Sequence, residues 1–247
     1  MNNNFIAKIQ NLSLDFKGKK LFKNLNFNIL ENRSTALLGS SGVGKSTLLR
    51  CIADLEIDNI TNGKIVLKED VSIAWLSQEN SLYPWLSILD NVQLYHHLKG
   101  SKTKQTLQKA KELLSQVNMS EHQNKKTYEL SGGQKQRVAL ARTLMQDANL
   151  ILMDEPFSAL DAITKIQLQD LTCQLLKDKT VVLVTHDPQE AIKLANHIYI
   201  LKNHPVILEE AALLEGDLPH QLSNEKLWNL QEELISKLQG NDQGNKI

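Results

Sequence analysis

The sequence has very few cysteines. Among its 247 residues only Cys51 and Cys173 occur, and they lie far apart, outside any CxxC pair or Cys/His cluster. This pattern argues against a zinc site and is typical of a protein kept in a reducing cytosol. We predict that both thiols pack in the hydrophobic core.

The sequence also lacks an excess of charge and any long apolar run. Lys+Arg 28 balance Asp+Glu 28, so the overall charge favours neither nucleic acid nor an anionic membrane surface as a partner. No apolar run approaches the roughly 18 residues of a membrane-spanning helix, and residues 1–4 have neither the charged nor the apolar part of a signal peptide. We therefore expect any membrane role to depend on a partner protein.

Two local features are weak functional signals. The basic tract from Lys99 to Lys111 has no interleaved aromatics and follows helical spacing, which predicts a solvated helix face rather than a nucleic-acid site. His96 and His97 are adjacent, so they cannot both ligate a metal from one face of a helix. We expect both histidines at the surface.

The spacing of apolar residues divides the chain into regions with strand-like and helix-like periods. Short alternating runs between Phe5 and Leu38 predict a small antiparallel sheet with strands at 6–9, 12–16 and 25–29. Two further strands are expected at 63–67 and 71–76. From about Pro84 to Glu129 the period becomes helical, which predicts an inserted helical subdomain.

After Leu130 nearly continuous apolar strands alternate with helices, as a buried parallel sheet requires. This pattern predicts strands at 150–154, 181–184 and 198–201, and helices at 163–176 and 188–195. A stripe of leucines predicts a last helix over 224–238. The polar, Gly-rich residues from Gln239 onward predict a disordered tail.

The strongest chemical motif is Gly39-Ser40-Ser41-Gly42-Val43-Gly44-Lys45-Ser46-Thr47, set between the apolar residues 36–38 and an apolar helix-like segment. It fits the P-loop pattern. Its glycines let backbone N–H groups converge on a polyphosphate, toward which the following helix points its positive end. Lys45 would reach the terminal phosphates, and the Ser46 hydroxyl would hold magnesium. The alternative is a Gly/Ser-rich turn before an ordinary helix.

A second set of polar residues follows apolar strands. Asp154 ends the run 150–153 and is expected to reach the magnesium, which brings Glu155 beside the terminal phosphate. There the carboxylate could accept a proton from the attacking water or only orient that water. Gln78 could reach the magnesium or the water, and His186 the terminal phosphate. Phe16 could stack on an adenine. Each of these three alone also fits an ordinary loop or strand residue.

The pentapeptide Leu130-Ser131-Gly132-Gly133-Gln134, followed by Gln136-Arg137, connects these motifs. Here the sequence resembles the ATP-binding cassette (ABC) family of transport ATPases, whose signature is this pentapeptide. The resemblance covers nearly the whole chain in order: Phe16 at the adenine-stacking position, Gly39 to Thr47, Gln78, Leu130 to Gln134, Leu150 to Glu155, Ser158 to Asp161, and His186. A Gly-rich turn that opens a helix offers N–H donors and a serine hydroxyl for phosphate. In the family the signature serves the nucleotide of the opposite subunit.

The resemblance implies an α/β fold: a P-loop NTPase core with a mostly parallel sheet, an N-terminal antiparallel β-subdomain and an inserted helical subdomain. We expect a single ATPase domain over 1–238, with the helical subdomain at about 84–135 and a disordered tail at 239–247. The implied cofactors are ATP and Mg²⁺, with Ser46, Gln78 and Asp154 on the metal.

The implied partners follow from the same resemblance. One P-loop and one signature per chain imply a homodimer in which each copy completes the site of the other. Integral membrane permease subunits, and a periplasmic or lipid-anchored substrate-binding protein, would place the chain on the cytoplasmic face of the plasma membrane; no nucleic acid is implied. The apolar residues 82–86 could dock on a permease or simply pack the helical subdomain.

The stretch 82–92 is similar to the ATPases of nitrate, sulfonate, taurine and thiamine-precursor importers. The chain departs from the family pattern at Asn32-Arg33, where a Gly-Glu pair is usual, and at 54–63, which lacks the usual Gly-rich form. We expect an importer ATPase; an exporter ATPase and a soluble ABC ATPase acting on DNA or ribosomes are the alternatives. A non-hydrolysing regulatory binder would be expected to lose Glu155 or His186.

Overall fold

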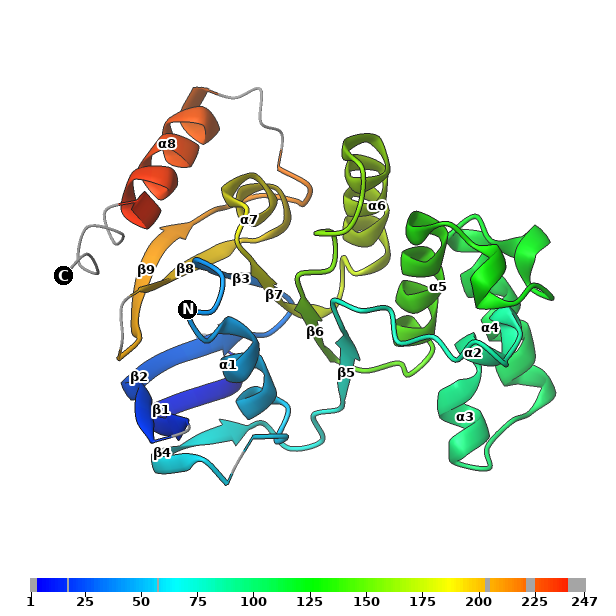
Figure 1. Ribbon diagram of the computed structural model, residues 1–247, viewed down its shortest axis with the longest axis horizontal. Helices are drawn as coiled ribbons and strands as arrows, with labels where there is room; N and C mark the ends of the chain where they lie inside the picture. The colour runs from blue at the N-terminus through cyan, green and yellow to red at the C-terminus, as the bar shows by residue number, and fades with distance from the viewer. Residues whose placement is uncertain (1–3, 17, 57, 203–204, 221–224, 240–247) are drawn as a thin grey trace. The chain divides into compact units, whose positions relative to one another are not determined.

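The computed structural model describes residues 4–16, 18–56, 58–202, 205–220 and 225–239. The chain divides into two compact units, and Figure 1 labels the α-helices and β-strands of both. The first unit comprises the chain up to Val71 and from Leu176 onward, and the second comprises Ser72 to Leu175. Each unit is described by itself below.

The first unit opens with an antiparallel sheet in the order β2-β1-β4, formed by β1 (Phe5–Phe16), β2 (Lys19–Leu30) and β4 (Ile60–Leu67). The sequence predicts two strands at 6–9 and 12–16, but the structure has one, with a shift of register between Ile9 and Leu12. Asn11 within this shift has a φ of 50°. A bulge of this kind resets which side chains face inward, so the apolar alternation breaks although the strand continues.

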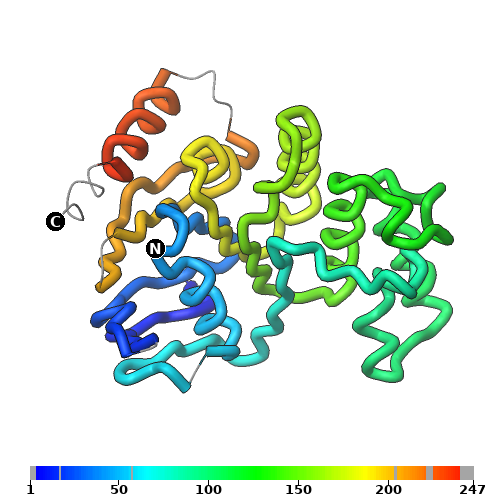
Figure 2. Tube along the Cα trace, in the orientation of Figure 1, coloured from blue at the N-terminus to red at the C-terminus, as the bar shows by residue number. Residues whose placement is uncertain are grey.

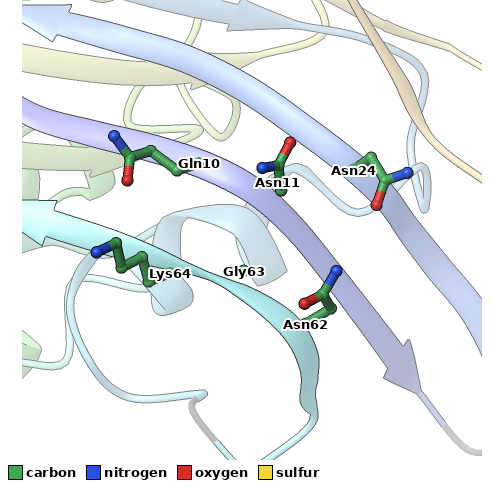
Figure 3. A pocket seen from close by; sticks show the side chains of 6 residues that line it. All are labelled: Gln10, Asn11, Asn24, Asn62, Gly63 and Lys64. Atoms are coloured by element: carbon green, nitrogen blue, oxygen red, sulfur yellow. The ribbon is translucent and has the colours of Figure 1, made fainter.

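A polar pocket of about 410 Å³ lies over this bulge, and Figure 3 labels the residues that line it: Gln10, Asn11, Asn24, Asn62, Gly63 and Lys64. Gly63 has a φ of 83°, and a Cβ there would lie 2.3 Å from the carbonyl oxygen of Asn11. Only glycine lets β4 approach β1 this closely. The pocket contains none of the residues predicted for a nucleotide site.

The first unit also holds strands in the order β7-β3-β8-β9, formed by β3 (Ser34–Leu38), β7 (Thr180–Thr185), β8 (His197–Lys202) and β9 (Ile207–Leu213). β3 runs parallel to β7 and β8, whereas β9 is antiparallel to β8. Every residue of β3 and β7 is buried, which explains their apolar runs at 36–38 and 181–184. Sequence reasoning missed β9 because its exposed edge position imposes no clear apolar alternation.

Helices α1 (Lys45–Ile52), α7 (Pro188–Leu194) and α8 (Glu225–Gln239) complete the first unit. One apolar cluster joins β3, β8, α7 and α8, with Leu234 of α8 fully buried in it. The predicted leucine stripe of the last helix provides this contact, while Trp228 stays 54% exposed. Gln239 is the last residue of α8, and the rest of the predicted tail, 240–247, lies outside the described residues.

The second unit contains the parallel strands β5 (Ile73–Leu76) and β6 (Leu150–Asp154). Its helices, traced in Figure 2, are α2 (Ile88–Val92), α3 (Leu94–Leu98), α4 (Lys104–Gln116), η1 (Ser120–His122), η2 (Thr127–Glu129), α5 (Gly132–Leu144) and α6 (Ala162–Leu175). Apolar residues of α2, α4 and α5 form a common core. α2, α3, α4, η1 and η2 lie within 84–135, where the sequence predicts a helical subdomain, whereas α5 begins there and continues to Leu144. The boundaries of the subdomain stay a prediction.

The α/β class is confirmed, with an antiparallel N-terminal sheet, mostly parallel strands elsewhere and a helical region. Cys51 and Cys173 are 3% and 7% exposed, as predicted for core residues. Across the described ranges no helix is long and apolar enough to cross a membrane. In the same part of the chain, no group of three His, Cys, Asp or Glu side chains gathers as a metal site.

Candidate functional site

The P-loop motif joins the end of β3 to the start of α1 in the first unit. Gly42 and Gly44 have φ values of 80° and 111°, a conformation that side chains other than glycine rarely adopt. A Cβ on Gly44 would also lie 3.1 Å from the Phe22 ring, and one on Gly39 would lie 3.0 Å from the carbonyl oxygen of Leu201. The tight fold of this loop therefore depends on its glycines.

Lys45 is buried inside this loop. Its side chain is 4% exposed, and Nζ donates hydrogen bonds to the carbonyl oxygens of Gly39 at 2.8 Å and Ser40 at 2.9 Å. A buried ammonium group needs partners, and here the carbonyl groups of the loop supply them. The loop thus surrounds a positive charge at the N-terminus of α1, an arrangement whose chemistry fits a polyphosphate.

His186 follows directly after β7, beside the start of the same loop. Leu38 of β3 pairs with Thr185 of β7, and the Gly39 N–H donates to the carbonyl oxygen of Thr185 at 3.3 Å. The next residue, Asp187, caps α7 by accepting from the Gln189 N–H at 2.9 Å. His186 is therefore held between the end of β7 and the capped helix α7. The hydrogen bond from Gly39 to Thr185 brings this position next to the start of the P-loop.

Phe16, the residue predicted to stack on an adenine, ends β1. Its side chain is 41% exposed. An exposed ring at a strand end can stack on a flat ligand. Its role in nucleotide binding stays a prediction.

In the second unit, the strand register brings together the ends that carry Gln78 and Asp154. Leu76 of β5 pairs with Met153 of β6 in parallel. Gln78, just after β5, and Asp154, the last residue of β6, therefore lie at the same edge of the sheet. Carboxylate and amide oxygens are the ligands that Mg²⁺ prefers in proteins. The chemistry of this pair therefore suits the predicted metal.

Glu155, directly after β6, has an unusual backbone. Its φ is 44°, in the left-handed region that costs a non-glycine residue about 1 kcal/mol or more. The Ser158 N–H and hydroxyl both donate to the Glu155 carbonyl oxygen, at 3.3 and 3.0 Å, and hold the turn. Backbone strain of this type concentrates at functional sites, which supports a functional role for the Glu155 carboxylate.

The signature segment 130–134 opens helix α5. Ser131 is the N-cap: its hydroxyl accepts from the Gln134 N–H at 3.3 Å, and its own N–H donates to Gln134 Oε1 at 2.9 Å. This reciprocal pair is a capping box. A Cβ on Gly133 would lie 2.5 Å from Cγ2 of Thr164 in α6, so glycine is needed for these helices to approach. Gly132 faces open space among the described residues.

Two polar side chains of α5 hold loops that carry predicted site residues. Gln136, 3% exposed, donates to the Pro156 carbonyl oxygen at 2.6 Å, just after Glu155. Arg142 donates to the carbonyl oxygens of Asn80 at 2.7 Å and Ser81 at 2.8 Å, just after Gln78. Burial lowers the pKa of the Arg142 guanidinium. Sequence reasoning missed Arg142; a single arginine in the apolar stretch 138–144 is the signal that it left unused.

The predicted docking segment, 82–86, displays two aromatic rings. Trp85 is 67% and Tyr83 39% exposed, and the rings stack edge to face at 5.1 Å. Asn91, fully buried, accepts from the Tyr83 N–H at 2.8 Å and donates to the carbonyl oxygens of Tyr83 and Ser87 at 3.1 and 3.0 Å. Leu82, in contrast, packs against the helical core. The segment is thus anchored at Leu82 and Tyr83 and exposes its indole.

Comparisons with known proteins agree with this geometry. A family model described as ABC transporter matches residues 22–158. An uncharacterised ABC transporter ATP-binding protein of Haemophilus influenzae is 54% identical, and the match covers 95% of this chain and 99% of the relative. An aliphatic sulfonates import ATP-binding protein of Paracoccus denitrificans is 40% identical over 79% of this chain and 78% of the relative.

A solved structure gives the same result for the fold. It is a dimeric, post-hydrolysis state of an ATP-binding cassette bound to ADP and Pi. Its TM-score to this chain is 0.71 at 33% identity, and the match covers 85% of this chain and 99% of that one. The predicted P-loop NTPase fold is thereby confirmed.

Proposed function

Because the chain belongs to the ABC transporter family and is an ATPase, we propose that it powers the import of a small sulfonate-type solute through separate membrane permease subunits. The observation that carries the proposal is the buried Lys45 inside a glycine-dependent loop at a helix N-terminus, in a chain similar to a sulfonate import protein. Lys45 supports the use of ATP, and the relative supports the solute.

In the proposed site, the P-loop N–H groups and Lys45 bind the phosphates of ATP, and Phe16 stacks on the adenine. Ser46, Gln78 and Asp154 would hold Mg²⁺, which when bound neutralises charge on the phosphates. The Glu155 carboxylate accepts a proton from the attacking water or orients it, and His186 contacts the γ-phosphate. Ser131, Gly132, Gly133 and Gln134 serve the nucleotide of a second copy.

The dimeric relative supports this two-copy arrangement. A head-to-tail pair gives each P-loop the signature of the other copy, so ATP binds both chains only when they close. The signature's contacts to the γ-phosphate exist only in that closed state and are lost on hydrolysis, which gives the difference in affinity that drives opening.

Membrane permease subunits are the proposed partners of Trp85 and Tyr83. The exposed rings, on a segment whose backbone Asn91 holds, are typical of an interface anchor. Docking would place the chain on the cytoplasmic face of the plasma membrane. A substrate-binding protein is the further partner expected of an importer.

The ATP site is tested first by Lys45→Ala. Loss of its charge-assisted hydrogen bonds to phosphate, worth roughly 3 kcal/mol, should weaken ATP binding by about 100-fold or more. Equilibrium dialysis with labelled ATP measures this affinity, with Lys111→Ala on the exposed face of α4 as the matched control. Unchanged affinity in Lys45→Ala would remove the P-loop from the binding site.

The transport role is tested by purifying the tagged chain from membranes of its native host and identifying the proteins that accompany it. We expect a permease and, for an importer, a substrate-binding protein that binds sulfonates. Trp85→Ala should lose the permease because an exposed anchor of this size dominates an interface, while its ATPase activity without partners is unchanged. Trp228→Ala, also exposed, is the control. A ribosomal or DNA-bound partner, or a permease without any binding protein, contradicts the importer.

A further inference from the structure

One contact of α5 has no part in the ATP chemistry proposed above. Nε2 of Gln134, the last residue of the signature segment, lies 3.2 Å from Nε2 of His122, which ends η1. The imidazole is partly buried. Its other nitrogen, Nδ1, is buried and has no hydrogen-bond partner among the residues that the structure describes.

The donors and acceptors around Gln134 determine the direction of this hydrogen bond. The Ser131 N–H can only donate, so its partner at 2.9 Å is the carbonyl oxygen of the Gln134 side chain. That leaves the amide NH₂, which also can only donate, facing His122. His122 Nε2 is therefore the acceptor, and the ring is the neutral tautomer with its proton on Nδ1.

This acceptor supports the cap of the signature helix. If Nε2 offered no lone pair, the Gln134 amide could gain a partner there only by turning over. The amide NH₂ would then oppose the Ser131 N–H, two donors without an acceptor between them, and one half of the capping box would be lost. The Nε2 lone pair thus gives the amide NH₂ an acceptor in the orientation in which Gln134 and Ser131 form the capping box.

We propose that His122 is a positioning residue for the signature: its Nε2 accepts from the Gln134 amide and so stabilises the capping box with Ser131, which closes over the nucleotide of the second copy. This inference rests on the proposed function, because it assigns His122 a part in the site formed between copies. It predicts an effect on turnover and on dimer closure, and none on ATP binding by the P-loop of the same chain.

The kinetic test compares two variants. His122→Leu keeps an apolar side chain of similar size and removes the acceptor, whereas His122→Gln keeps an acceptor oxygen on a flexible chain. His122→Leu should lower kcat by about fivefold, the factor that one ordinary neutral hydrogen bond contributes, with KM for ATP unchanged. His122→Gln should recover most of kcat. Equal loss in both variants, or loss that follows a lowered melting temperature, means a packing role and overturns the proposal.

A spectroscopic test does not depend on ATPase activity. Nitrogen-15 NMR of histidine-labelled full-length protein, assigned by the loss of one signal in His122→Leu, reports which ring nitrogen carries the proton. We expect an unprotonated Nε2 and a protonated Nδ1, and a change of that signal in Gln134→Leu. A protonated Nε2 overturns the inference. If wild-type protein does not hydrolyse ATP, the proposed function fails, and the NMR result still decides the contact between His122 and Gln134.

Discussion

Single polar side chains hold the loops of the candidate site, and the half-buried Arg142 shows this most clearly. Its guanidinium bonds two consecutive carbonyl groups of the loop that follows Gln78, and burial lowers its pKa. A cation that loses part of its hydration needs such partners to compensate. Arg142 therefore ties the signature helix to the loop that carries a predicted magnesium ligand.

We expect Arg142→Met to release this loop. The methionine keeps an unbranched apolar chain but removes the donors of the Asn80 and Ser81 carbonyl groups. Because water can reach the exposed Ser81, the loss costs about 1–2 kcal/mol of unfolding free energy. ATPase turnover should fall while ATP affinity is unchanged, because the P-loop contacts do not involve Arg142. Urea unfolding and steady-state kinetics measure both effects, with the exposed Arg33→Met as control. Equal stability of the two variants would show that these hydrogen bonds contribute little.

Motifs explain which site residues could be predicted from sequence and which could not. Lys45, Glu155 and Ser131 lie in short segments whose residue types and spacing themselves indicate chemistry. Arg142 and His122 act through partners that are 61 and 12 residues away, so their roles exist only in the folded chain. A polar residue in an apolar helix was the one available signal for Arg142.

At the scale of elements, the approach of β4 to β1 depends on a single glycine. We expect Gly63→Ala to cost about 1 kcal/mol for its positive φ and a further 1–3 kcal/mol for the close contact with the Asn11 carbonyl group. Gly100→Ala is a matched control: its φ is also positive, at 62°, but nothing lies within 4 Å of the added Cβ. Urea unfolding of both variants measures the difference. Equal destabilisation would mean that the sheet relaxes around the methyl group.

Element boundaries were predictable where burial imposes an apolar run or an apolar period on the sequence, and less so elsewhere. β3 and β7, buried along their whole length, read as apolar runs, and the leucine stripe of α8 faces its apolar cluster. The bulge at Asn11 divided β1 into two expected strands because side-chain alternation restarts there. β9, half-exposed at a sheet edge, has no such period and was missed.

At the scale of the whole molecule, one chain carries a P-loop and one signature segment, each on a different compact unit. The P-loop and the signature segment were both predictable from sequence, because each is a short local motif. The need for a second copy does not follow from any single motif. It follows from the proposal that the signature acts on the nucleotide of another chain, which a change at Glu155 can test.

Glu155→Gln should trap the closed dimer. The amide keeps the size and the backbone turn of Glu155 but cannot accept the proton of the attacking water, so ATP stays bound and the γ-phosphate contacts that hold two copies together persist. Sedimentation velocity in ATP should show a dimer for Glu155→Gln and a monomer for the double variant with Lys45→Ala, which cannot bind the nucleotide. The exposed Glu112→Gln controls for the change of charge. A Glu155→Gln chain that stays monomeric in saturating ATP would count against a site shared between copies, and an unchanged rate of hydrolysis would remove Glu155 from the chemistry.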